Sequence, residues 1–315
     1  MTVGVEPVRD LAADELERAA PASLWRDTIR NILRQRSAVI GLIILLFLFL
    51  VALFAPVIAP YGPDDSMLDL GIPGRRGEAP CIHLLGCPAD RVQHIMGLDS
   101  NLRDEFSRIV YGSRVSLQVG FLTVGLSIIV GSFIGAMAGF FGGAADNVLM
   151  RLMDIVLSFP SLILAIAIVT VLGSGLINAQ MAIAIVAVPI YARVMRASVL
   201  SVREADFVTA SRALGESSRG ILSRRVLPNA LTPAIVQGTL GIGAAILEVA
   251  ALSFVGLGAQ PPQAEWGAMI SQDRNLFFSA PHLIFFPGVA ITLVVLGFNL
   301  LGDGMRDALD PRLNR

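Results

Sequence analysis

Long apolar stretches alternate with polar segments along the whole chain. A helix that crosses a membrane needs about 20 mostly apolar residues. Six stretches reach that length, at residues 37–58, 115–138, 148–172, 179–200, 230–257 and 283–301. The first follows a polar segment too long for a signal peptide, so we interpret it as a retained span. The pattern predicts an all-α polytopic membrane protein with six transmembrane helices.

Arginines beside these stretches predict the orientation. A cluster before the first stretch, including Arg30 and Arg34, places the N-terminus in the cytoplasm by the positive-inside rule. Alternation then places the arginine-rich segment 201–229 and the C-terminal tail in the cytoplasm as well. The long loop 59–112 also contains arginines, but long loops cross a membrane largely regardless of charge. Both termini are therefore expected to be cytoplasmic.

The expected organisation has five parts. They are a cytoplasmic segment 1–36, a first transmembrane helix 37–58, an extracytoplasmic loop 59–112, a five-helix core 113–303 and a tail 304–315. Within the first part, Trp25, Ile29, Ile32 and Leu33 fall on one helical face, and Ser23 is a candidate N-cap. This pattern indicates an interfacial helix along the inner leaflet, or else a simple extension of the first span.

Composition narrows the function. Hydrophobic residues make up 54% of the chain and charged residues 16%, which is typical of a protein in lipid. The net charge of −1 argues against a nucleic-acid partner. All basic residues are arginine, so the chain cannot build a Walker-type phosphate loop, which needs a lysine. With no catalytic or metal-binding motif in view, we expect neither an enzyme nor a metal site, and no cofactor bound by this chain.

The spans contain one glycine stripe and few charges. Gly131, Gly135 and Gly139 recur on one face of the second span, where they favour close helix packing, either static or shifting between two states. Glu248 lies within the fifth span, and an intramembrane carboxylate is usually functional or paired. It is a candidate structural acceptor or a gate or pathway contact, with Ser253 nearby. Arg151 and Asp154 are spaced to pair on one helix face.

The cytoplasmic segment 201–229 predicts two short helices. The first places Phe207, Ala210 and Leu214 on one face and ends at Gly215. Ser217 or Ser218 can cap the second helix, and Pro228 is expected to stop it. A simple joint between two spans needs only a few residues. We therefore expect an element that docks on a soluble partner; the alternative is a solvated basic loop.

The same segment resembles the EAA loop of permease subunits from type I ATP-binding-cassette (ABC) importers. Thr209 and Ser211 stand where the eponymous motif has Glu and Ala, while the glycine, the spacing and the Leu-Pro pair are kept. By this resemblance, the residues expected to couple to the ATPase are Thr209, Ala210, Ser211, Arg212, Ala213, Leu214, Gly215, Glu216, Ser217 and Pro228.

Further motifs extend the resemblance from about Ser37 to the end. The run from His94 through Asp99 to Asp104 is similar to the family's entry motif, with Leu102 in place of its second glycine. The run around Ser253 and the residues 299–312 also match in order. Together they resemble the C-type subunit of the dipeptide and oligopeptide permease group.

This resemblance implies an importer in a prokaryotic plasma (inner) membrane. It implies a second, B-type permease subunit, two ABC ATPase subunits that bind ATP and Mg, and an extracytoplasmic solute-binding protein. Peptides are the expected substrate, with nickel complexes, oligosaccharides and opines as alternatives in the same architecture. An ion-coupled secondary transporter, the alternative of another class, would show paired charges deep in the membrane.

The only two cysteines, Cys81 and Cys87, lie in the predicted external loop. Five intervening residues and an oxidising compartment favour a disulfide. Two free thiols, or a metal site with His83 and His94, are the alternatives. We expect the loop to help seat the binding protein.

Overall fold

The computed structural model describes residues 32–309, and these form a helical bundle. Five helices are long and apolar enough to cross a membrane, and a bent helix pair can supply a sixth span. The five are α3 (Arg36–Leu53), α5 (Glu105–Phe141), α8 (Leu176–Arg203), α12 (Thr232–Phe254) and α14 (His282–Leu309). The bent pair is α6 (Gly143–Leu157) and α7 (Ser161–Leu172).

The expected third span, 148–172, is not one straight helix. Its two halves, α6 and α7, meet at 92° across a break at residues 158–160. Pro160 has no N–H for the helix ladder, and it disfavours helical geometry at Phe159 before it. The prediction of a continuous helix was wrong because it relied on the apolar composition of the stretch and did not take Pro160 into account.

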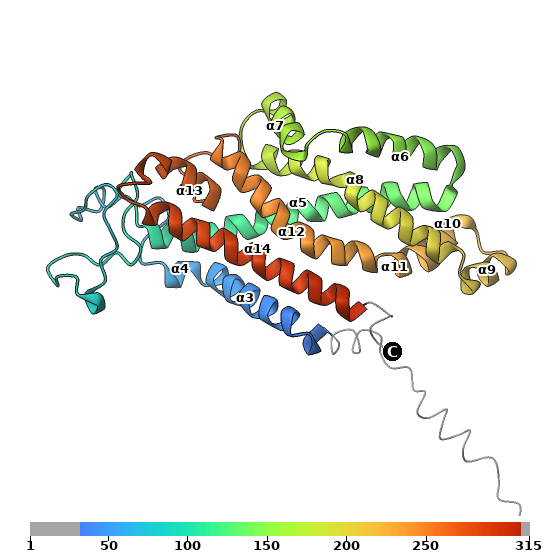
Figure 1. The fold of residues 1–315 in the computed structure, drawn as a ribbon, viewed down its shortest axis with the longest axis horizontal. Helices are drawn as coiled ribbons and strands as arrows, with labels where there is room; N and C mark the ends of the chain where they lie inside the picture. The colour runs from blue at the N-terminus through green and yellow to red at the C-terminus, as the bar shows by residue number, and fades with distance from the viewer. Residues whose placement is uncertain (1–31, 310–315) are drawn as a thin grey trace, which may run out of the picture.

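Helix α5 lies at the centre of the bundle (Figure 1). It packs along α8, and α12 and α3 also contact it. Helix α14 packs between α12 and α3, while α6 and α7 lie on the α8 side. The buried core joins Leu117 of α5, Ile183 of α8 and Ile246 of α12, which are all less than a tenth exposed.

Short elements gather at the two ends of the bundle (Figure 1). At one end lie α9 (Asp206–Ala213), α10 (Ser218–Gly220), a π-helical segment (Ile221–Val226) and α11 (Leu227–Ala230). At the other end lie α4 (Ala55–Ile58), α13 (Trp266–Asp273) and two 3-10 turns (His83–Leu85 and Arg274–Leu276). By the predicted orientation, the first end is cytoplasmic and the second is external.

Two element boundaries differ from expectation. Helix α5 begins at Glu105, inside the predicted loop 59–112, because Asp104 caps it by accepting the Ser107 N–H at 2.8 Å. Helix α14 continues past residue 303 to Leu309. Most of the predicted interfacial helix, including Ser23 and Trp25, lies outside the described residues.

Candidate functional site

The cytoplasmic segment folds into a helical turn around Gly215. The N–H of Gly215 donates to Arg212 O and the N–H of Glu216 donates to Ser211 O, both at 3.1 Å. This pair of bonds is a Schellman motif, which needs a left-handed residue after the helix. Gly215 supplies it with φ +81°. Ser217 then caps the next helix by accepting the Gly220 N–H at 3.2 Å.

Pro228 does not stop the second helix. It lies in the first turn of α11, where its missing N–H has no partner to lose. The chain before it relaxes into the π-helical segment and then continues through Leu231 to α12. The expected helix-turn-helix is therefore present, but its second half is a chain of short segments.

The apolar face expected on α9 points outward. Leu214 is 87% exposed and Phe207 is 45% exposed, while Val208 is the α9 residue that is buried. Val208 packs with Met195 and Val199 of α8 in a small apolar cluster. Exposed positions of the predicted coupling set also include Thr209, Ala210, Arg212, Ala213, Gly215, Ser217 and Pro228, with Ser211 and Glu216 half-buried. The loop thus has an anchored base and an exposed apolar tip.

The glycine stripe forms the seam between α5 and α8. A methyl group at Gly131 would lie 2.7 Å from Val188 O, and one at Gly139 would lie 2.9 Å from Arg196 O. At Gly135 an added carbon would collide with the main chain at Ala192. The absence of side chains is therefore what lets the two backbones touch.

The charges at the inner end of α8 pair with α6. Arg193 donates to Asp154 at 2.6 Å, and Arg196 holds Asp146 through two bonds, one of them 2.6 Å. The expected pairing of Arg151 with Asp154 was wrong, because the α6 face turns Asp154 toward α8. Together with Arg151, these side chains line a polar groove of about 800 Å³.

Glu248 and Ser253 have different surroundings. Glu248 is half-buried and accepts a hydrogen bond from Ser161 at the start of α7, at 3.3 Å. Ser253 is 2% exposed, and its hydroxyl accepts the Ala259 N–H at 3.1 Å. Ser253 therefore stabilises the turn after α12, and it also lines a small pocket of about 210 Å³ at that turn. Ser161 was missed from sequence, since only the break at Pro160 brings it beside α12.

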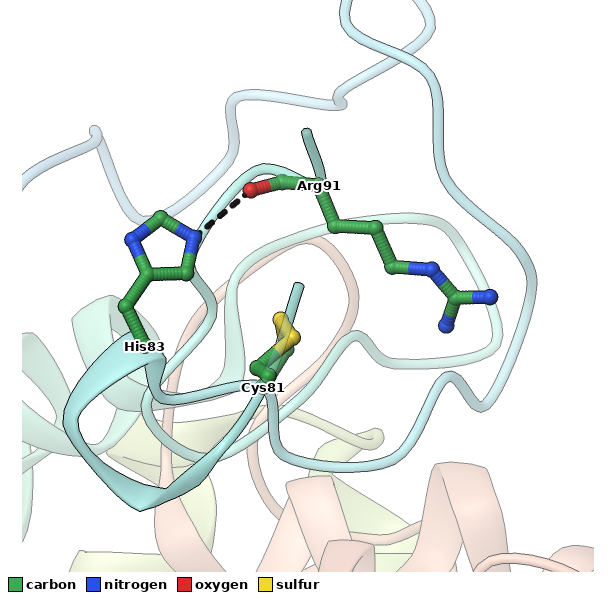
Figure 2. Close-up of a disulfide and its surroundings, with 4 residues drawn as sticks. Cys81, His83 and Arg91 are labelled. Carbon is green, nitrogen blue, oxygen red and sulfur yellow. Dashed lines mark hydrogen bonds between the residues drawn. A yellow bond between two sulfur atoms is a disulfide. The ribbon is translucent and has the colours of Figure 1, made fainter. Parts of the chain in front are cut away.

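Figure 2 shows the external loop with its disulfide between Cys81 and Cys87. The His83 ring bonds to Arg91 O at 2.8 Å across the same loop. Both cysteines are therefore in the disulfide, and neither is a free thiol. Residues 32–309 contain no group of three side chains suited to a metal ion. The ring presents Leu84 and Leu85 to solvent, 93% and 79% exposed.

The entry motif ties this loop to the bundle. Asp99 accepts from Arg103 at 2.7 Å, and Arg103 donates to Gln272 of α13 at 2.7 Å. His94 Nδ1 and Asp104 Oδ1 form a hydrogen bond of 3.1 Å. Gln272 was not singled out from the sequence, because its role depends on α13 lying against the start of α5.

Comparison with known proteins places this fold among membrane permeases. The solved structure of the MetNI methionine ABC transporter in an inward-facing conformation superposes with a TM-score of 0.53. The match covers 64% of this chain and 97% of that chain, at 21% sequence identity. The described bundle therefore has the fold of an ABC importer permease.

The sequence matches are more specific. The family model "Binding-protein-dependent transport system inner membrane component" matches residues 131–315, and the N-terminal TM domain of oligopeptide transport permease C matches residues 23–72. This chain belongs to the family of binding-protein-dependent transport permeases. It is a multi-pass protein of the inner membrane, as the sequence predicted.

Three relatives cover nearly the whole chain. The dipeptide transport system permease protein DppC of Alkalihalophilus pseudofirmus is 44% identical over 98% of this chain and 95% of its own. The di/tripeptide permease DppC of Pseudomonas aeruginosa is 44% identical over 92% and 91%. The glutathione permease GsiD of Pectobacterium atrosepticum is 40% identical over 92% and 91%.

Proposed function

We propose that this chain imports short peptides, as one of two permease subunits that together form the pathway. The names of its relatives support a peptide substrate, because dipeptides, tripeptides and glutathione all carry a peptide backbone. Nickel complexes and oligosaccharides remain the alternative cargo. Nothing in the described bundle favours an ion-coupled transporter, since Glu248 has a hydroxyl rather than a charged partner there.

The observation that best supports an ATPase partner is the exposed Leu214 side chain at the tip of the loop. A large apolar side chain that is 87% exposed, on a turn fixed by a Schellman motif, suits a pocket on another protein. ATP and Mg bind on that partner, because a chain without lysine has no Walker-type loop of its own. The permease subunit itself is not an enzyme.

The charged face of α6 and α8 supports a second permease subunit. Arg193 and Asp154 have side chains about half exposed on helices of membrane-spanning character. Charges in that position are costly against lipid, so they face protein or water. By contrast, α3 presents Ile43, Leu46 and Phe47 outward, as a lipid-facing helix does. We assign the α6–α8 face to the partner subunit and the pathway.

The ring around Leu84 suits the solute-binding protein. Two exposed leucines at the tip of a disulfide-closed loop form a small apolar contact surface outside the membrane. Bound substrate would reach the α6–α8 face from this side. The selectivity for one peptide over another then lies largely with the binding protein.

Co-purification from the native membrane tests the assignment. We expect the tagged chain to bring down a second permease and two ATPase subunits. Leu214→Asp should weaken ATPase retention by about 30-fold, the loss typical of one interface hot spot. Leu84→Asp is the matched control, because it changes an equally exposed leucine on the opposite side. Full ATPase retention by Leu214→Asp would contradict the docking role.

Uptake assays distinguish the role of the external loop from that of the cytoplasmic segment, and they also identify the cargo. Leu84→Asp should lower peptide uptake that depends on the binding protein and leave ATPase retention unchanged. Leu68→Asp, at a 73% exposed external position outside the ring, should leave both intact. If labelled dipeptides do not compete for uptake while a nickel complex or an oligosaccharide does, the peptide assignment is wrong and the architecture stands.

A further inference from the structure

An apolar groove of about 360 Å³ lies between α3 and α14 near their external ends. Toward the cytoplasmic side the same helices touch through small residues: a methyl group on Gly41 would lie 2.6 Å from Gly297 O. Nearer the outside, the facing positions carry large side chains, among them Val51 and Phe286. The two helices are therefore in close contact at one end and held apart by larger side chains at the other, which leaves the groove between them.

The polar groups in the floor of the groove are already hydrogen-bonded within the protein. The floor is formed by α5 and by Trp266 of α13. The Ser113 hydroxyl in the floor already donates to Val110 O at 2.6 Å, and the Trp266 Nε1 donates to Ile109 O at 3.1 Å. With these polar groups paired, the cavity suits hydrocarbon, because apolar cavities do not hold ordered water.

An exposed cation stands beside the groove. Arg114 follows Ser113 in the chain and donates to the carbonyls of Ala52 at 2.5 Å and Leu53 at 2.9 Å. Its guanidinium lies 5.9 Å from the ring centroid of Tyr111. Among the described residues Arg114 has no acidic partner.

The position of Arg114 matches the headgroup boundary. The apolar stretch of α5 begins at residue 115, directly after Arg114, and α3 ends at Leu53. Tyrosine is enriched at both membrane interfaces, and an arginine near a helix end extends its charged group to the interface. An arginine at this depth is stabilised by an anion, and guanidinium binds phosphate in a bidentate fashion.

We propose that a phospholipid of the outer leaflet binds at this junction. One acyl chain lies in the groove, and the lipid phosphate bonds to Arg114. The site lies where the segment matched by the N-terminal domain model meets the transport core, so the lipid fills the joint between them.

Fluorescence quenching tests the acyl chain. The protein has two tryptophans, so Trp25→Phe leaves Trp266 as the only one in the full chain. In vesicles of acyl-brominated phosphatidylglycerol, we expect Trp266 to be quenched although it is only 1% exposed. Ala290→Phe, which fills the groove, should remove most of this quenching. Val57→Phe, at an 82% exposed site on α4 outside the groove, should leave it unchanged.

Unquenched Trp266 in the Trp25→Phe protein overturns the proposal, and so does equal quenching with and without Ala290→Phe. Ser113→Leu fills the groove from its floor on α5 and must give the same loss. This second variant keeps the test decisive if Ala290→Phe fails to fold.

Titration of brominated phosphatidylglycerol against an unbrominated diacylglycerol, which has no phosphate, tests the phosphate contact. Arg114→Gln should weaken binding of the anionic lipid by about tenfold, the loss expected for one charge-assisted contact. Arg114→Lys keeps the charge and should retain most of the affinity. Identical titrations for the wild type and Arg114→Gln would overturn the assignment of Arg114.

Discussion

Arg203 Nη1 donates a 2.7 Å hydrogen bond to the main-chain carbonyl of Gly139. Arg203 is the last residue of α8 and lies at the start of the cytoplasmic segment 201–229, while Gly139 belongs to the glycine stripe of α5. The bond therefore joins the base of the loop to the seam between the two central helices. A displacement of the loop by an ATPase subunit would therefore act on α5 and α8 together at this point.

The seam requires glycine at position 135. Gly135→Ala should destabilise the protein by about 2 kcal/mol, since its methyl group collides with the main chain of α8. Thermal unfolding of the purified complex measures the change. Gly125→Ala is the matched control on the same helix, because its methyl group meets nothing within 4 Å. Equal unfolding temperatures for the two variants would contradict close packing at the seam.

The turn requires a left-handed residue at position 215. Gly215→Val should strain the turn by about 1–2 kcal/mol, because a β-branched residue disfavours positive φ. No atom lies within 4 Å of an added methyl group there, so the effect is conformational. We expect ATPase activity to continue while uptake falls. Gly215→Asn, which tolerates this geometry, should retain uptake; normal uptake by Gly215→Val would reject the docking role.

Leu102 stands where the family motif has its second glycine, and its φ is +63°. A leucine in the left-handed region carries strain, so Leu102→Gly should stabilise the external segment by about 1 kcal/mol. Hydrogen exchange of the neighbouring amides measures the gain. Leu98→Gly in the same motif should destabilise instead, because the Leu98 side chain is fully buried. A loss of protection in Leu102→Gly would contradict the strain.

Glu265 caps α13 by accepting the N–H groups of Gly267 at 3.0 Å and Ala268 at 2.9 Å. Burial raises the pKa of the Glu265 carboxyl above its ordinary value of 4.5, although these bonds oppose the shift. The folded state then binds this proton more tightly than the unfolded chain does. The contribution of Glu265 to stability is thus greatest below pH 4.5 and falls as the pH rises through the folded pKa.

Hydrogen exchange of the α13 amides, corrected for intrinsic rates, tests this sign. The wild type should lose protection as the pH rises from 4.5 through the folded pKa. Glu265→Gln keeps an acceptor for the cap without the titration, so its protection should change less over that range. The same slope in both proteins would show that another group causes the dependence.

Several features followed from the sequence alone because they depend on local composition. Apolar stretches located the membrane helices, since lipid requires about 20 apolar residues to cover a span. Gly215 and Ser217 located the turn of the cytoplasmic segment 201–229, since a left-handed residue and a cap act within a few residues of themselves. The spacing of the family motifs also identified the class of permease.

Other features depended on contacts between distant segments. Asp154 pairs with Arg193 rather than Arg151 because α6 packs against α8, and Ser161 reaches Glu248 because the chain bends at Pro160. Val208, not the predicted face of Phe207 and Leu214, anchors α9, because α8 lies under only one side of that helix. Sequence periodicity marks an apolar face, but only the packing of neighbouring helices decides whether that face is buried or left free for a partner.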